Sequence, residues 1–188
     1  MTSGAPPPGA PDGWTTNPSS WGQRLPIIGL ATAGFVIAGY LALFQFDVLS
    51  TVWEPFFGRG SRRILTSRIS HLLPIPDAAL GALGYVADAV TGAIGGTERW
   101  KRRPWLVVLF GIAVGPLGAV SVLLVIFQPV LFSSFCTLCL VTAVISVLMI
   151  GPAFDEVLAS LQALRRVRDR GGSVWSAFWR GTEEAVPA

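Results

Sequence analysis

Charge, histidine and cysteine are all scarce in this sequence. Charged residues make up 13% of the 188 residues, whereas hydrophobic residues make up 52%, and the mean hydropathy is +0.59. A soluble domain of this size cannot bury so much apolar surface, so the composition indicates a membrane protein. Basic residues are not interleaved with aromatic ones as they are in grooves that bind nucleic acid, so we expect no nucleic-acid partner.

Metal ligands are equally few. The chain has one histidine, His71, and two cysteines, Cys136 and Cys139. Two thiolates do not complete a metal site, and two cysteines do not make a disulfide framework. A lone histidine is more often a surface or capping group than a ligand. We therefore expect no bound metal.

The first 23 residues contain no lysine or arginine and are rich in proline, glycine, serine and threonine. They lack the charged start of a signal peptide, and the apolar run that follows is too long for a signal peptide. We expect residues 1–23 to be a disordered cytoplasmic tail and the apolar run to be a retained membrane helix.

Four stretches are apolar enough to be membrane helices. They are residues 25–46, 74–96, 104–127 and a stretch from the C-x-x-C to about residue 150. A helix needs roughly 20 apolar residues to cross the hydrocarbon layer. We therefore predict an all-α, polytopic protein in which residues 24–152 form a bundle of four transmembrane helices. Gly151-Pro152 predicts a break, and residues 153–188 are expected to be an amphipathic, interfacial segment that either extends the last helix or lies along the surface.

The basic residues predict the orientation. With four spans, ten basic residues share one side with both termini, and four lie in the loop between the first two spans. The positive-inside rule places the termini in the cytoplasm and the C-x-x-C at the outer face. In a bacterial cell membrane, that face is the compartment in which disulfides persist.

The C-x-x-C is the candidate redox centre. On a helix, Cys136 and Cys139 lie one turn apart on the same side. Free N–H groups and the helix dipole at the start of the helix favour a thiolate at Cys136, whereas apolar surroundings at Cys139 oppose one. This difference suits an exposed Cys136 that exchanges with a thiol and a buried Cys139 that meets an apolar electron acceptor. The alternative is that both are ordinary small apolar residues.

Two acidic residues lie in the second span. Asp77 follows Pro76 and suits the first turn of a helix. Asp88 lies about four helical turns after Pro74, counted at about 3.6 residues a turn. An ionisable group within a membrane helix is a candidate functional site, and a small carrier that uses Asp88 is one reading. The other reading is that Asp88 reaches the headgroups or the basic loop that follows.

The arrangement resembles the vitamin K epoxide reductase family, including its bacterial members. The resemblance rests on the four spans, the basic first loop, the C-x-x-C and two local strings, Ser61–Ser67 and Ile75–Tyr85. It implies a four-helix bundle around a quinone pocket, with the first loop as a cap. It also implies that Cys136 exchanges with a thiol partner and that Cys139 contacts the quinone.

The resemblance also implies binding residues and partners. Asp77 lies near the position of an asparagine that bonds the quinone carbonyl in the family, and Ser67 matches the serine of the loop segment, so both are expected to bind quinone. The expected acceptor is menaquinone or ubiquinone, and the expected donor is a thioredoxin-like extracytoplasmic thiol protein. The family's loop cysteine pair is missing, with Ser61 at one of its positions, and Ala143 replaces a frequent tyrosine.

The sequence therefore predicts a membrane thiol–quinone oxidoreductase. The alternative is a non-catalytic protein of the same fold that binds quinone or a partner, because the loop cysteines that would feed the C-x-x-C are absent.

Overall fold

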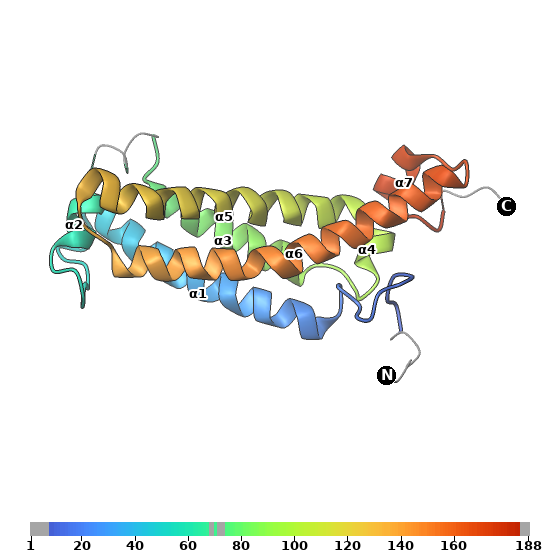
Figure 1. Cartoon of the computed structure of the whole chain (residues 1–188), viewed down its shortest axis with the longest axis horizontal. Helices are drawn as coiled ribbons and strands as arrows, with labels where there is room; N and C mark the ends of the chain where they lie inside the picture. Colours follow the sequence, from blue (N-terminus) through green and yellow to red (C-terminus); the bar gives the residue numbers. More distant parts are fainter. Residues whose placement is uncertain (1–7, 68–69, 71–73, 185–188) are drawn as a thin grey trace. The chain divides into compact units, whose positions relative to one another are not determined.

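The structure is a computed structural model that describes residues 8–67, 70 and 74–184. His71 and Arg68, which the sequence places in the first loop, lie outside the described residues. Within the described part of the chain all regular structure is helical. The helices are α1 (Trp21–Gln45), α2 (Gly60–Leu65), α3 (Asp77–Ala93), α4 (Arg99–Arg102), α5 (Pro104–Phe132), α6 (Thr137–Asp169) and α7 (Val174–Arg180) (Figure 1).

Three of these helices, α1, α5 and α6, are long and apolar enough to cross a membrane. They confirm three of the four predicted spans. The fourth, α3, has 17 residues. Asp77 is its first residue, as predicted, and the chain turns away at Gly95, whose φ is +91°. At 1.5 Å per residue α3 is about 25 Å long, somewhat less than a typical hydrocarbon core. Its crossing of the membrane stays a prediction.

The described residues form two compact units. The first consists of the described parts of residues 1–28, 90–112 and 151–188, and the second of residues 29–89 and 113–150. Helix contacts in the second unit depend on small residues. Gly84 of α3 faces the Leu117 side chain, and Gly118 of α5 faces Ile150, each without room for a side chain of its own. Close approach of this kind is how membrane helices gain packing energy.

The first unit is built around two buried arginines. Arg99 forms an ion pair with Glu156, and both side chains are almost completely buried. Ser19 donates a further hydrogen bond to Glu156. Arg24 donates to the carbonyls of Gly92, Ile94 and Gly95. The guanidinium groups thereby satisfy carbonyls at the end of α3 that the helix itself leaves without donors.

Residues 8–23 correct the prediction of a disordered tail. They form turns and the first residues of α1, and Ser19 is completely buried. The sequence could not indicate this, because the partner of Ser19 is 137 residues away. Residues 1–7 lie outside the described residues.

The predicted break at Gly151-Pro152 is also wrong. Helix α6 passes through both residues and continues to Asp169. Proline removes one backbone donor, and membrane helices tolerate that loss where packing holds the helix. Ala153 directly after it is completely buried. Of the two alternatives for the C-terminal segment, continuation of the last helix is therefore confirmed.

Three aromatic residues of the C-terminal segment, Trp175, Phe178 and Trp179, lie on α7. Its Trp179 stacks on Trp105, with ring centroids 6.2 Å apart, and contacts Trp175 and Phe178 edge to face. Trp175 remains largely exposed. A mostly apolar cluster with an exposed indole suits an interface between lipid and water.

Candidate functional site

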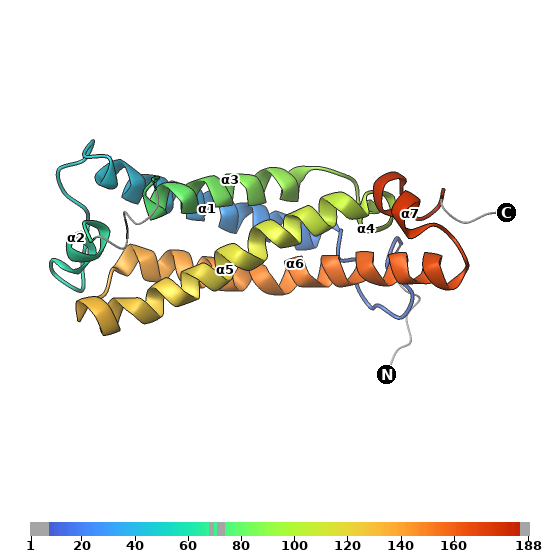
Figure 2. The same ribbon diagram turned by 90° about the horizontal axis from the view of Figure 1, so that it is seen from above.

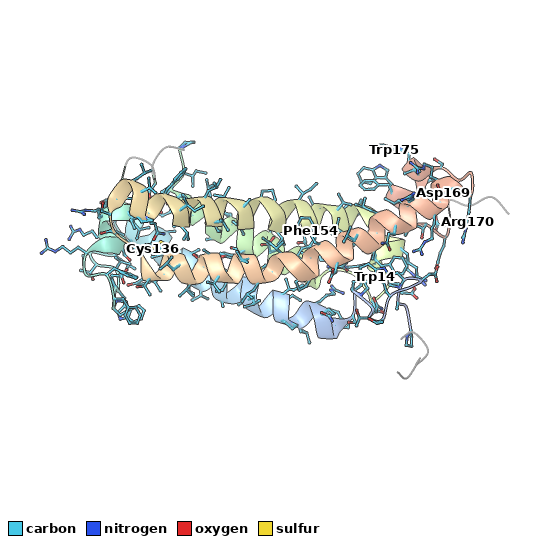
Figure 3. The ribbon with its side chains drawn as sticks, in the orientation of Figure 1. Trp14, Cys136, Phe154, Asp169, Arg170 and Trp175 are labelled. Carbon is cyan, nitrogen blue, oxygen red and sulfur yellow. A yellow bond between two sulfur atoms is a disulfide. The ribbon has the colours of Figure 1, made fainter. Side chains whose placement is uncertain are left out.

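The two cysteines form a disulfide at the start of α6. Their Cα atoms are 5.2 Å apart. Cys136 directly precedes the helix, and its carbonyl accepts the first helical hydrogen bond, from Leu140 N at 3.0 Å. The Cys139 N–H lies 3.2 Å from the Cys136 sulfur. Cys136 thus has the position of a helix cap, in the second unit, and Figure 3 shows its place at the start of the α6 ribbon.

The burial of the two sulfurs differs from the expectation. Cys136 is completely buried, whereas Cys139 is half-buried. The expected exposure of Cys136 is therefore wrong. Residues of the first loop pack against Phe135, the residue before it: Gly60 lies against the carbonyl of Phe135, and the rings of Phe57 and Phe135 are 5.3 Å apart. Figures 1 and 2 both place α2 beside the connection between α5 and α6.

The backbone N–H groups around Cys136 are also bonded. Gln128 at the end of α5 accepts a hydrogen bond from Cys136 N at 3.0 Å, and Glu54 accepts one from Thr137 N at 2.9 Å. These donors were expected to be free to stabilise a thiolate. The two acceptors were not found by sequence reasoning, because Glu54 is 83 residues from its partner.

Glu54 is the centre of a hydrogen-bond network that joins the first loop to α6. Its carboxylate accepts hydrogen bonds from the hydroxyl groups of Ser61 and Thr137 and from the N–H groups of Phe56 and Phe57. Burial raises the pKa of Glu54, but the hydrogen bonds from Ser61, Thr137 and Phe56 outweigh burial and lower the pKa to about 2. The carboxylate is therefore ionised at neutral pH.

An apolar cluster lies beside Cys139. Its buried members are Leu41 and Phe44 of α1 and Leu65 of α2. Half-buried residues pack against them, namely Tyr40, Leu49, Val52, Ala78, Leu138 and Cys139 itself. The sulfur of Cys139 therefore lies in surroundings that suit an apolar ring.

A polar pair borders this cluster. Gln45 at the end of α1 donates from Nε2 to Asp77 Oδ1 at 2.6 Å and accepts from Ala78 N at 3.2 Å. A hollow of about 430 Å³ is lined by Gln45 together with Phe44, Leu65 and five further residues. Its size lies within the range of small-molecule sites, at the small end. Its lining is mostly polar, with Asp47, Ser50, Arg62 and Thr66 beside the three apolar residues, so the apolar ring of a quinone is better matched by the cluster at Cys139.

Ser67 and Asp77, the two predicted quinone-binding residues, are linked through Ser70. The Ser67 hydroxyl lies 3.4 Å from that of Ser70 and accepts from Ser70 N at 3.3 Å. Asp77 N donates to the Ser70 carbonyl at 3.2 Å. The structure thus brings Asp77 next to the apolar cluster through Ala78, and it brings Ser67 to Asp77 through one intermediate residue.

Asp88 is completely buried in α3, in the second unit. The expectation that it reaches the headgroups disagrees with this burial. One helical turn earlier, the Tyr85 hydroxyl donates to the Thr142 carbonyl and bonds the Ser146 hydroxyl, both at 2.7 Å. Ser121 extends the chain of hydroxyl groups at 3.2 Å. These groups come from α3, α5 and α6, and together they place polar side chains in the interior of the second unit.

Among the described residues no group of three or more histidine, cysteine or acidic side chains could hold a metal ion. The site therefore offers a disulfide, an apolar cluster and a polar pair as its chemical groups. These suit electron transfer between thiols and an apolar acceptor.

The comparison with protein families agrees with this chemistry. The model of the Vitamin K epoxide reductase family matches residues 25–153, which include every site residue described above. No curated protein matches the chain.

Proposed function

The chain belongs to the vitamin K epoxide reductase family, and we propose that it oxidises an external thiol or dithiol through Cys136 and Cys139 and passes the electrons to a membrane quinone. The family's members are generally oxidoreductases that act in membranes on thiols and quinones. The observation that carries the proposal is the position of Cys139. It is bonded to Cys136 and packs against the apolar cluster that the Gln45–Asp77 pair borders.

The first half of the reaction is thiol–disulfide exchange at Cys136. A partner thiolate attacks the Cys136 sulfur, the bond to Cys139 breaks, and Cys139 leaves as a thiolate. The partner's second thiolate then attacks the partner's first sulfur, which is bonded to Cys136 in the mixed disulfide, and Cys136 leaves as a thiolate. The partner has then lost two electrons and two protons, and the cysteine pair holds the two electrons.

The second half returns the pair to the disulfide. A bound quinone would supply the acceptor for two electrons and the two protons that the thiols gave up. Cys139, in the apolar cluster, would contact its ring. As Cys136 attacks the Cys139 sulfur and the S–S bond re-forms, two electrons would pass from the cysteine pair to the quinone, which takes up two protons and leaves as the quinol. The Ser67 hydroxyl would donate to a quinone carbonyl, Asp77 would accept from a hydroxyl of the quinol that forms, and Gln45 would hold Asp77 in position through the 2.6 Å hydrogen bond.

The membrane arrangement is part of the proposal. In it, α3 is the fourth span, residues 24–152 are a four-helix membrane domain capped by the first loop, and residues 153–188 are an interfacial C-terminal segment. Both termini face the cytoplasm of a bacterial cell, so the disulfide lies at the outer face. The donor there is a thioredoxin-like thiol protein, and the acceptor is menaquinone or ubiquinone.

A turnover assay tests the proposal. Full-length protein in nanodiscs is mixed with dithiothreitol and a soluble ubiquinone or menaquinone analogue, and quinone absorbance is followed. Cys136→Ser and Cys139→Ser should each reduce the rate to that of the protein-free mixture. Val141→Ser places the same residue on an exposed position of α6 and should keep the wild-type rate. Equal rates for the cysteine variants and the wild type would overturn the proposal.

The missing loop cysteines favour one alternative, a non-catalytic protein that binds quinone or a partner. This alternative predicts no dithiol-dependent turnover by the wild type, although quinone still quenches tryptophan fluorescence. Turnover that depends on both cysteines would exclude it.

A further inference from the structure

The first loop contains an acidic residue, Glu54, that has no role in the proposed reaction. Glu54 is the only acidic residue between Asp47 and Asp77. Its carboxylate accepts from Thr137, the first residue of α6, and from Ser61 of α2. The bonds to Thr137, which lies between the two cysteines, hold the loop against the disulfide, and the bond from Ser61 holds the Glu54 carboxylate in place within the loop.

The loop is fastened on both sides of Cys136. On the C-terminal side, Glu54 bonds the N–H and the hydroxyl of Thr137. On the N-terminal side, Gly60 lies directly against the Phe135 carbonyl, so closely that no side chain would fit at position 60. Cys136 between them has no exposed surface. A thiol cannot attack this sulfur while these contacts hold.

The negative charge of Glu54 lowers the reactivity of Cys136, as does the packing of the first loop over the sulfur. A carboxylate at the start of a helix offsets the dipole that would stabilise a nearby thiolate, and repels that thiolate directly. The other charged groups near this place are basic. Arg59, Arg62 and Arg63 line a hollow of about 340 Å³ with Ser134, and Arg63 donates to the Phe132 carbonyl at 3.3 Å. They favour a thiolate, so Glu54 is the group that opposes it.

We propose that Glu54 is a positioning residue that limits the reactivity of Cys136, by fastening the first loop over the sulfur and by opposing its thiolate. Release of the carboxylate from Thr137 then precedes thiol exchange. The inference rests on the proposed function only in naming Cys136 as the exchanging cysteine. The reactivity of this sulfur can be measured without quinone or turnover.

The test is the rate at which iodoacetamide alkylates Cys136 between pH 6 and 10. Cys139→Ala in every sample leaves one thiol. Glu54→Gln should raise the rate at pH 7 about tenfold and lower the pH midpoint by about one unit, the shift expected when a neighbouring charge of like sign is removed. The pKa of Glu54 is about 2, so the carboxylate stays ionised over this range and the midpoint reports on the thiol.

Two further variants distinguish the effect of fastening the loop over Cys136 from the effect of the negative charge of Glu54. Ser61→Ala removes one hydrogen bond but keeps the charge, so it should raise the rate at every pH without moving the midpoint. Glu54→Asp shortens the side chain and keeps the charge, and should behave as Ser61→Ala does. Glu98→Gln, which neutralises an acidic residue in the other unit, should leave both quantities unchanged.

An unchanged midpoint and rate in Glu54→Gln would overturn the inference, as would a midpoint that moves equally in Glu98→Gln. If Glu54→Gln does not fold, an alkylation rate of Glu54→Asp that equals the unsubstituted rate overturns it instead. Failure of the turnover assay with an altered alkylation profile would refute the proposed function and leave this inference standing.

Discussion

Ser61 of α2 is bonded to the carboxylate that also bonds the start of α6. Its hydroxyl donates to Glu54. The same carboxylate accepts from Thr137, so a shared acceptor brings position 61 close to Thr137, the residue after Cys136. Hydrogen bonds through Glu54 therefore attach the first loop to the start of α6.

This proximity gives a prediction at the residue scale. In a Cys139→Ser background, Ser61→Cys should form a disulfide with Cys136 on mild oxidation, because Glu54 bonds both Ser61 and Thr137, which adjoins Cys136. Mass spectrometry of linked peptides measures it. Thr66→Cys, on an exposed position after the same helix, is the matched control and should give little of this product. Equal yields from both variants would contradict the arrangement.

At the scale of elements, the apolar runs predicted the helices well and the contacts between them poorly. Helix α1 was expected over residues 25–46 and spans Trp21–Gln45, because a long apolar run has one stable form in lipid. The hydrogen bonds of Glu54 and Gln45 join residues 83 and 32 positions apart. Local pattern holds no information on such pairs. The candidate cysteines could therefore be predicted from sequence, but their burial and their hydrogen-bond partners could not.

The Arg99–Glu156 pair gives a prediction for the elements of the first unit. Both side chains are almost completely buried, and Arg99 also donates to carbonyls at the end of α3. Glu156→Gln would leave the guanidinium without its counter-charge, at a cost of about 3–5 kcal/mol in the free energy of unfolding. Thermal unfolding in detergent should therefore show a marked fall in Tm.

Glu183→Gln is the control for that measurement. Glu183 pairs with Lys101 but is 59% exposed, and exposed pairs contribute little to stability. Its Tm should stay close to that of the wild type. If Glu156→Gln and Glu183→Gln were equally stable, the buried pair would have no structural role.

For the whole molecule, the family, the apolar helices and the disulfide agree on a redox protein of the membrane. The sequence predicted the all-helical class of the protein and identified the two cysteines of the candidate site. The ordered N-terminal residues and the continuous α6 did not, because each depends on packing between segments distant along the chain. The electron transfer that we propose, from the cysteine pair to a quinone, would connect these features into a single function.

The redox state of Cys136 and Cys139 in the purified, full-length protein tests this claim most directly. The protein is reduced, freed of reductant under argon and divided into samples with and without a quinone analogue, and remaining thiols are counted by mass after alkylation under denaturing conditions. We predict that both thiols disappear together as the disulfide forms with quinone, and that both persist without it. Two thiols that persist equally in both samples would contradict the proposed function.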